Sequence, residues 1–164
     1  MNNRIRAICV GGTIDKIYFD ANSKYEIGAP ALAKILQQMP IHLDIKLTSL
    51  MAKDSLDMND DDRALIKHAV NNCEQKRIII THGTDTMTDT AAALGKQTDK
   101  TIVLTGALQP SVFKETDALL NVGGALAAVQ TLAPGVYIVM NGEVFDAHSV
   151  KKDVANQRFV RTET

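Results

Sequence analysis

The sequence lacks an excess of either charge. Lysine and arginine number 18 against 19 aspartates and glutamates, and no long run of one sign occurs. A nucleic-acid partner requires a clustered basic face, so we expect no nucleic-acid binding. No segment approaches the roughly 20 apolar residues of a membrane helix, and the N-terminus shows no apolar leader run. These absences predict a protein that binds no membrane and resides in the cytoplasm.

Signals for cofactors and cross-links are also missing. The two cysteines, Cys9 and Cys73, form neither a disulfide framework nor a zinc-binding pattern. The glycine fingerprints of dinucleotide and phosphate loops do not occur, so a Rossmann-type binder is the weakest option. Residues 60–62 form the densest acidic cluster, and acids favour the first turn of a helix. We therefore expect no cofactor and no metal.

What the sequence does contain is an alternation of apolar runs and helical stretches. The chain has 164 residues, of which 45% are hydrophobic, and this suits one domain over residues 1–164. Continuously apolar strands interleaved with helices predict a three-layer α/β/α domain around a mostly parallel sheet. The expected strands are residues 5–10, 43–47, 77–81, 101–104 and 136–140, with a short return strand at 144–145. One expected helix begins near residue 31, and three others cover residues 60–73, 85–96 and 116–132.

Glycine and threonine recur where the predicted strands end. Gly12 and Thr13 follow the first strand, and a His-Gly-Thr-Asp segment follows the third. Parallel sheets bind ligands at the carboxyl ends of their strands, where glycine exposes backbone N–H groups and threonine supplies a hydroxyl. Taken singly, Thr84 and Asp85 are typical helix caps, and His82 is typical of a packed turn residue. Their recurrence across several strand ends favours a binding or catalytic site.

Short motifs in register along nearly the whole chain make the prediction more specific. They are GGTI at 11–14, YEIG at 25–28, DSLDMND at 54–60, ITHGTDTM at 80–87, LTGALQPS at 104–111, Asp117 with Asn121, VMN at 139–141, and Lys152. In these motifs the sequence resembles the bacterial-type L-asparaginases, threonine amidohydrolases that include the glutaminase-asparaginases. The resemblance implies the asparaginase N-terminal fold, hydrolysis of L-asparagine to L-aspartate and ammonia, and some activity on L-glutamine. It also implies a homo-oligomer, a dimer or a tetramer.

The resemblance assigns catalytic roles to five residues. Thr13 would be the nucleophile, with Tyr25 on a mobile lid beside it. Thr84 is similar to the family's second catalytic threonine, hydrogen-bonded to Lys152 with Asp85 alongside. A threonine hydroxyl is a weak nucleophile, so a base or a lysine-centred network must activate it. The residues leave open which threonine attacks first; we favour Thr13, because closure of a lid over it would exclude water.

The resemblance also implies a set of substrate-binding residues. Ser55 and Asp85 would hold the α-carboxylate and α-amino groups of the substrate. The backbone around Thr84 and Ala107 would hold its side-chain amide. The full set is Gly12, Ser55, Leu56, Gly83, Thr84, Asp85 and Ala107.

The sequence departs from the family pattern in ways that bear on affinity. Leu56 stands where many members carry a polar residue, and Lys151 beside Lys152 leaves open which lysine enters the site. The resemblance covers only the first domain of the usual two-domain member, in which a neighbouring subunit's second domain supplies an acidic group. We expect no such second domain here, and hence weak substrate binding and a high KM.

Two other functions stay open at this point. One is a non-catalytic module that binds an amino acid without turnover, and the other is an amidase for a different small amide. A sensor would need Ser55 and Asp85 but has no use for Thr13 and Lys152. The presence of both residues therefore favours an enzyme.

Overall fold

The computed structural model describes residues 4–163, so residues 1–3 and 164 of the predicted domain lie outside the description. Its centre is a six-stranded sheet with the order β4-β1-β5-β6-β7-β8. Neighbouring strands from β4 to β7 run parallel, and β8 is antiparallel to β7. The strands are β1 Ile5–Gly11, β4 Ile45–Lys53, β5 Arg77–Thr81, β6 Thr101–Thr105, β7 Gly135–Met140 and β8 Glu143–Asp146.

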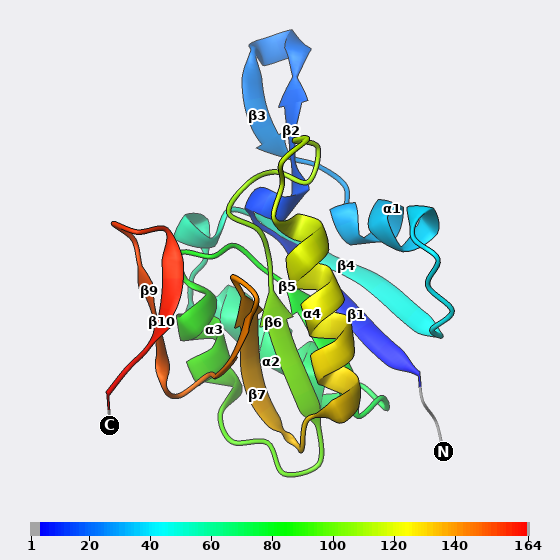
Figure 1. The fold of residues 1–164 in the computed structure, drawn as a ribbon, viewed down its shortest axis with the longest axis vertical. Helices are drawn as coiled ribbons and strands as arrows, with labels where there is room; N and C mark the ends of the chain where they lie inside the picture. The colour runs from blue at the N-terminus through cyan, green and yellow to red at the C-terminus, as the bar shows by residue number, and fades with distance from the viewer. Residues whose placement is uncertain (1–3, 164) are drawn as a thin grey trace.

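Helices cover both faces of this sheet and give the three layers seen in Figure 1. Leu32 of α1 and Ala125 of α4 share one core cluster with Val103, and Ile66 of α2 shares the other with Leu104. The predicted α/β fold, with central strands buried on both faces, is confirmed. Within residues 4–163, no helix has the length and apolar character needed to cross a membrane. The helices are α1 Ala31–Gln38, α2 Asp60–Asn71, α3 Met87–Leu94 and α4 Ala118–Thr131, with short 3-10 turns η1 Thr13–Asp15, η2 Asp20–Asn22 and η3 Ser55–Asp57.

Most elements lie within about two residues of their predicted ranges, and two of the differences have a clear physical reason. The strand predicted at residues 43–47 is β4, which begins later and pairs with β1 from Ile5↔Ile45 to Gly11↔Lys53. It lies at the sheet edge with none of its residues fully buried, so no continuous apolar run marks it in the sequence. The helix predicted at residues 85–96 is α3, which covers only Met87–Leu94 and is followed by Gly95, a residue with a φ of 67°.

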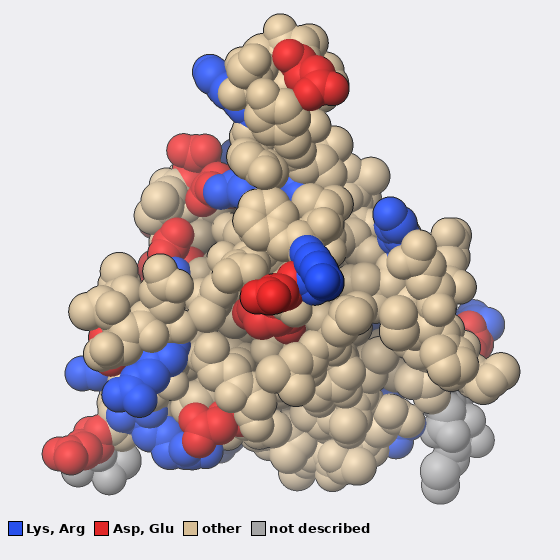
Figure 2. All heavy atoms as spheres, turned by 45° about the horizontal axis from the view of Figure 1, so that its top comes forward, with Lys and Arg blue, Asp and Glu red and all other residues tan. Residues whose placement is uncertain are grey.

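Two hairpins lie outside the central sheet. Strands β2 (Lys16–Phe19) and β3 (Lys24–Ile27) form one, and β9 (Val150–Asp153) and β10 (Arg158–Arg161) form the other. Among residues 4–163, the strands of each hairpin pair only with one another. The β2–β3 hairpin projects from the top of the molecule in Figure 1 and forms a knob with charges of both signs in Figure 2.

Candidate active site

The carboxyl ends of the parallel strands meet at a small polar cavity. Its volume is about 230 Å³. It lies between the loops that follow β1 and β5 and the β9–β10 hairpin, which approaches these loops. Parallel sheets place ligand sites at this edge. The lining residues are Thr13, Thr84, Asp85, Leu108, Lys152, Val154 and Gln157. Four of the five residues to which the resemblance gives catalytic roles are therefore neighbours in space.

A hydrogen-bonded group of three side chains occupies one wall of this cavity. The Lys152 Nζ lies 2.7 Å from the Thr84 Oγ1 and 2.5 Å from the Asp85 Oδ1. The Lys152 side chain is only 14% exposed, whereas Lys151 is exposed, so Lys152 is the lysine that enters the site. An amine held between a hydroxyl and a carboxylate can accept a hydroxyl proton when neutral and stabilise an alkoxide when charged.

Close backbone packing joins the three loops that surround the threonines. Gly12 has a φ of 90°, and a Cβ built on it would lie 2.4 Å from the Gly83 backbone nitrogen. A Cβ on Gly83 would lie 2.6 Å from the Ser55 Oγ. Only glycine permits both approaches. These two positions therefore fix the loops of β1, β5 and β4 against each other.

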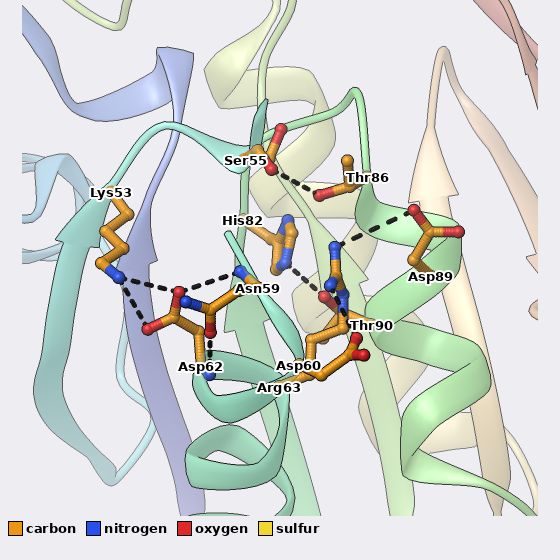
Figure 3. Close-up of polar contacts among 10 residues, drawn as sticks. All are labelled: Lys53, Ser55, Asn59, Asp60, Asp62, Arg63, His82, Thr86, Asp89 and Thr90. Atoms are coloured by element: carbon orange, nitrogen blue, oxygen red, sulfur yellow. Dashed lines mark hydrogen bonds and ion pairs between the residues drawn. The ribbon is translucent and has the colours of Figure 1, made fainter. Parts of the chain in front are cut away.

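Ser55 lies behind this junction and is 1% exposed. Its Oγ has no hydrogen-bond partner among residues 4–163. Its carbonyl oxygen accepts a 2.8 Å hydrogen bond from the Thr86 Oγ1, which Figure 3 shows reaching across from the β5 loop. Thr86 thus couples the position of Ser55 to that of Thr84.

His82, which precedes Gly83 in the same loop, has the surroundings of a residue that stabilises the fold. The side chain is fully buried, and its ring nitrogens lie 2.7 Å from the Gly83 carbonyl oxygen and 2.7 Å from the Thr90 Oγ1. Burial lowers the pKa of His82 to about 4, so the ring is neutral at pH 7. His82 is therefore the packed turn residue that the sequence predicted. In Figure 3 it lies between Ser55 and the Arg63 side chain, whose ion pair with Asp89 joins α2 to α3.

Six of the site residues named in the sequence analysis do not line the cavity: Gly12, Tyr25, Ser55, Leu56, Gly83 and Ala107. Tyr25 is half exposed on β3, and its ring centroid is 5.5 Å from that of Tyr18 and 5.8 Å from that of Phe113. Leu56 is 72% exposed in η3, although its backbone N–H is held by the Asp54 carboxylate. Neither side chain lines the cavity with Thr13.

The loop after β6 reaches the cavity through a residue that the sequence reasoning did not name. Leu108 lines the cavity beside the buried Ala107. The Asp117 carboxylate accepts hydrogen bonds from the backbone N–H groups of Leu108 and Gln109, and the Asn121 Nδ2 donates to the Gly106 carbonyl oxygen. In the sequence, the motif residues Asp117 and Asn121 were the features that could have indicated that the loop after β6 belongs to the site.

Val154 and Gln157 are the other lining residues that sequence reasoning missed. Both lie in the turn between β9 and β10, and Gln157 has a positive φ of 48°. Nothing in their residue types marks a site. Only the pairing of β9 with β10 carries this turn to the mouth of the cavity.

Comparison with known proteins identifies the family. Residues 4–159 match the family model described as "Asparaginase, N-terminal". The chain is 32% identical over 159 residues to a probable periplasmic L-asparaginase of Haemophilus influenzae, a match that covers 90% of this chain and 46% of the relative. It is 30% identical over 166 residues to a glutaminase-asparaginase of Acinetobacter glutaminasificans, with 93% of this chain and 50% of the relative covered.

A solved structure gives the same result in three dimensions. The crystal structure of L-asparaginase I from Vibrio cholerae superimposes with a TM-score of 0.83 at 26% identity, and covers 100% of this chain and 52% of that one. The chain thus spans about half the length of the relatives it matches. The chain belongs to the asparaginase family, and residues 4–159 correspond to that family's N-terminal domain.

Proposed function

We propose that the chain hydrolyses the side-chain amide of L-asparagine to give L-aspartate and ammonia. The observation that carries this proposal is the Lys152 Nζ, which lies 2.7 Å from the Thr84 Oγ1 in a cavity that Thr13 also lines. Amide hydrolysis needs a nucleophile, a proton carrier and a site for the developing oxyanion. Hydroxyl, amine and carboxylate groups in one cavity supply the first two, and the glycine-rich loops supply backbone N–H groups for the third.

In the proposed mechanism, the Thr13 hydroxyl attacks the amide carbon and its proton passes to the Thr84–Lys152–Asp85 group. That group returns a proton to the nitrogen as the C–N bond breaks and ammonia leaves. The resulting acyl-threonine ester is then hydrolysed by water, which restores the Thr13 hydroxyl. Tyr25 would join the site when the β2–β3 hairpin closes over it.

The substrate would be held by groups around the same cavity. Ser55 and Asp85 are proposed to bind its α-carboxylate and α-amino groups, and the otherwise unpartnered Ser55 Oγ supports this role. The backbone at Thr84 and Ala107 would bind the amide. Gly12 and Gly83 would contribute through their backbones, while the exposure of Leu56 leaves only its backbone to do so.

A second candidate is a module that binds an amino acid without turnover. The chain spans about half the length of its relatives, and Tyr25 lies away from Thr13. On this alternative, the pocket would recognise the amino acid but would lack the groups needed to complete the reaction. Activity on L-glutamine or on another small amide is a further variant, and one relative is named a glutaminase-asparaginase.

Ammonia release by the purified chain separates these alternatives. L-Asparagine, L-glutamine and D-asparagine are each supplied from micromolar to tens of millimolar concentration, and Tm is recorded with and without L-aspartate. We expect turnover of L-asparagine with a KM in the millimolar range. If no substrate releases ammonia while L-aspartate raises Tm, the chain is a binding module. Turnover would also support the proposal that this one domain suffices for the chemistry.

We also propose a homo-oligomeric assembly and a cytoplasmic location. Family resemblance favours a homo-oligomer, a dimer or tetramer, which light scattering of the purified chain would test. The cytoplasmic location stays a prediction, because the Haemophilus influenzae relative is named a periplasmic protein.

A further inference from the structure

The place of Lys152 depends on a hairpin that the central sheet does not include. Lys152 lies on β9, which pairs with β10, and in this register Lys152 is directly opposite Phe159. The position of Phe159 therefore sets how far the Lys152 side chain reaches toward Thr84. Whatever fastens Phe159 to the rest of the molecule also fixes Lys152.

Asn141 provides that connection through its side chain. The Asn141 Oδ1 accepts a 2.9 Å hydrogen bond from the Phe159 backbone N–H. Asn141 directly follows β7, so it lies at the same edge of the sheet as the loop after β5 that carries Thr84. One short path thus runs from the end of β7 through Phe159 to Lys152.

The other contacts between the β9–β10 hairpin and β8 restrict its position less narrowly than the Asn141 hydrogen bond does. Phe159 is 2% exposed, and its ring centroid is 6.4 Å from that of Phe145 on β8. Arg161 lies 3.2 Å from Glu143 and stacks 5.0 Å above the Phe145 ring. Arg161 also donates a 3.1 Å hydrogen bond to the Val144 carbonyl oxygen. Ring packing and the contacts of the long, exposed Arg161 side chain hold the hairpin against β8 but tolerate sliding. A hydrogen bond to one backbone N–H has a narrow distance and angle range, so it fixes the register.

A turn requirement alone does not account for this contact. Asn141 has a φ of 56° and Gly142 a φ of 77°, as expected for a two-residue turn between β7 and β8. Glycine would satisfy that backbone equally well. The turn therefore explains why residue 141 tolerates a positive φ, but not why its amide oxygen reaches another hairpin.

We propose that Asn141 is a positioning residue that holds the Lys152 amine within reach of Thr84 by fastening β10 to the end of β7. Asn141 does not contact the reacting atoms in this account. The consequence for turnover rests on the proposed amidohydrolase function, whereas the consequence for the position of Lys152 does not.

Two variants of the full chain test the proposal. Asn141→Gly keeps the turn and removes the acceptor, while Asn141→Asp keeps an acceptor oxygen in the same place. A displacement of about 1 Å in a catalytic group can cost about a hundredfold in rate. We expect kcat to fall about 10- to 100-fold in Asn141→Gly with KM within about threefold of the parent, and Asn141→Asp to restore most of kcat.

A second readout does not need turnover. Acetylation of each lysine by a limiting amine reagent is followed by peptide mass spectrometry, with the exposed Lys151 as the internal reference. We expect Lys152 to be protected in the parent and in Asn141→Asp, and to react several-fold faster in Asn141→Gly while other lysines keep their rates. A parent that releases no ammonia but shows this pattern would refute the proposed function and leave the positioning role supported.

Three results would overturn the positioning role. Lys152 could stay protected in Asn141→Gly, or the aspartate variant could react as fast as the glycine variant. Asn141→Gly could also lose its folded circular dichroism spectrum or expose all lysines together. That last result would show that Asn141 stabilises the whole domain and does not act on the position of Lys152 in particular.

Discussion

The loop after β5 and the β2–β3 hairpin carry two of the proposed catalytic residues, Thr84 and Tyr25, and are held in place in different ways. Thr84 follows a strand buried within the sheet, is 6% exposed, and is hydrogen-bonded to Lys152. Tyr25 is 50% exposed on a hairpin whose strands, within residues 4–163, pair only with each other. The loop after β5 is fixed by the buried core, whereas the hairpin is held mainly by the hydrogen bonds between its own two strands.

This difference matches the demands of the proposed chemistry. Proton transfer requires fixed distances between donor and acceptor, which a sheet edge provides. Substrate entry and water exclusion require a segment that can open and close, and such segments have few buried contacts. We therefore assign proton transfer to the loop after β5 and to Lys152, and closure over the site to the β2–β3 hairpin.

The largest expected effect comes from breaking the fixed region at Lys152. Lys152→Met keeps the length of the side chain but removes the amine that contacts Thr84 and Asp85. General acid–base groups contribute about 10²- to 10⁴-fold to rate, and we expect kcat to fall by that factor. Steady-state ammonia assays provide the measurement. Lys151→Met is the matched control and should stay within about twofold; equal losses in both variants would contradict the assignment.

The next largest effect concerns Asp15, where the hairpin joins the body. The Asp15 carbonyl oxygen accepts a hydrogen bond from the Gly28 N–H, and its Oδ1 accepts one from the Ala31 N–H, each at 2.8 Å. Burial raises the pKa of Asp15 from 3.8 to about 7. Between these two values the folded chain keeps a proton that the unfolded chain has released, so Asp15 lowers stability progressively as pH rises through this range.

Asp15→Asn should therefore stabilise the chain most above pH 7. We expect the gain in free energy of unfolding to be about 2 kcal/mol greater at pH 8 than at pH 5, as measured by chemical denaturation. His82 acts in the opposite direction, because its lowered pKa removes stability as pH falls from 6.5 toward 4. His82 is present in both chains, so the variant-minus-parent difference isolates Asp15. An equal gain at both pH values would contradict the account.

A smaller effect is expected from the hairpin's own tyrosine. Tyr25→Phe keeps the ring contacts with Tyr18 and Phe113 and removes only the hydroxyl. One neutral hydrogen bond made on closure is worth about 1 kcal/mol, so we expect kcat/KM to fall about fivefold. Tyr18→Phe on the same hairpin serves as the control and should change little. If both variants match the parent, the Tyr25 hydroxyl takes no part in the reaction.

The smallest effect should come from the ion pair at the base of the hairpin. The Lys16 Nζ lies 3.1 Å from the Asp54 Oδ2, and both side chains are about 30% exposed. Pairs of this kind contribute about 0.5 kcal/mol and are screened by salt. Lys16→Met should lower the unfolding free energy by that amount at low salt and by less at 1 M NaCl. A loss of unfolding free energy above about 2 kcal/mol would mean that the base of the hairpin is rigid. It would contradict the contrast between a fixed loop after β5 and a hairpin that can move.

The fold was predictable from the sequence because the central strands are buried on both faces. Their continuous apolar runs mark β5, β6 and β7 directly. The edge strand β4 was placed only in part, because Thr48, Ser49 and Lys53 interrupt its pattern. The two hairpins outside the sheet left no long apolar run in the sequence, because β2 and β3 are largely exposed and β9 and β10 bury one residue each.

The candidate site was predictable where residues follow a strand and not where pairing brings them in. Thr13, Thr84 and Asp85 follow predicted strands, and the cavity contains all three. Val154 and Gln157 enter only through the β9–β10 register, which residue types do not determine. The same register brings Lys152, and not Lys151, to Thr84.

The most direct test of the account compares two threonines of the same segment. Thr84→Val and Thr88→Val each exchange a hydroxyl for a methyl group of similar size, one in the cavity and one on α3. Ammonia release from millimolar L-asparagine is measured for the parent and both variants. The account predicts that the parent and Thr88→Val turn over at similar rates, while Thr84→Val loses at least about a hundredfold. Turnover by Thr84→Val at the parental rate would contradict the claim that the loop after β5 carries the chemistry.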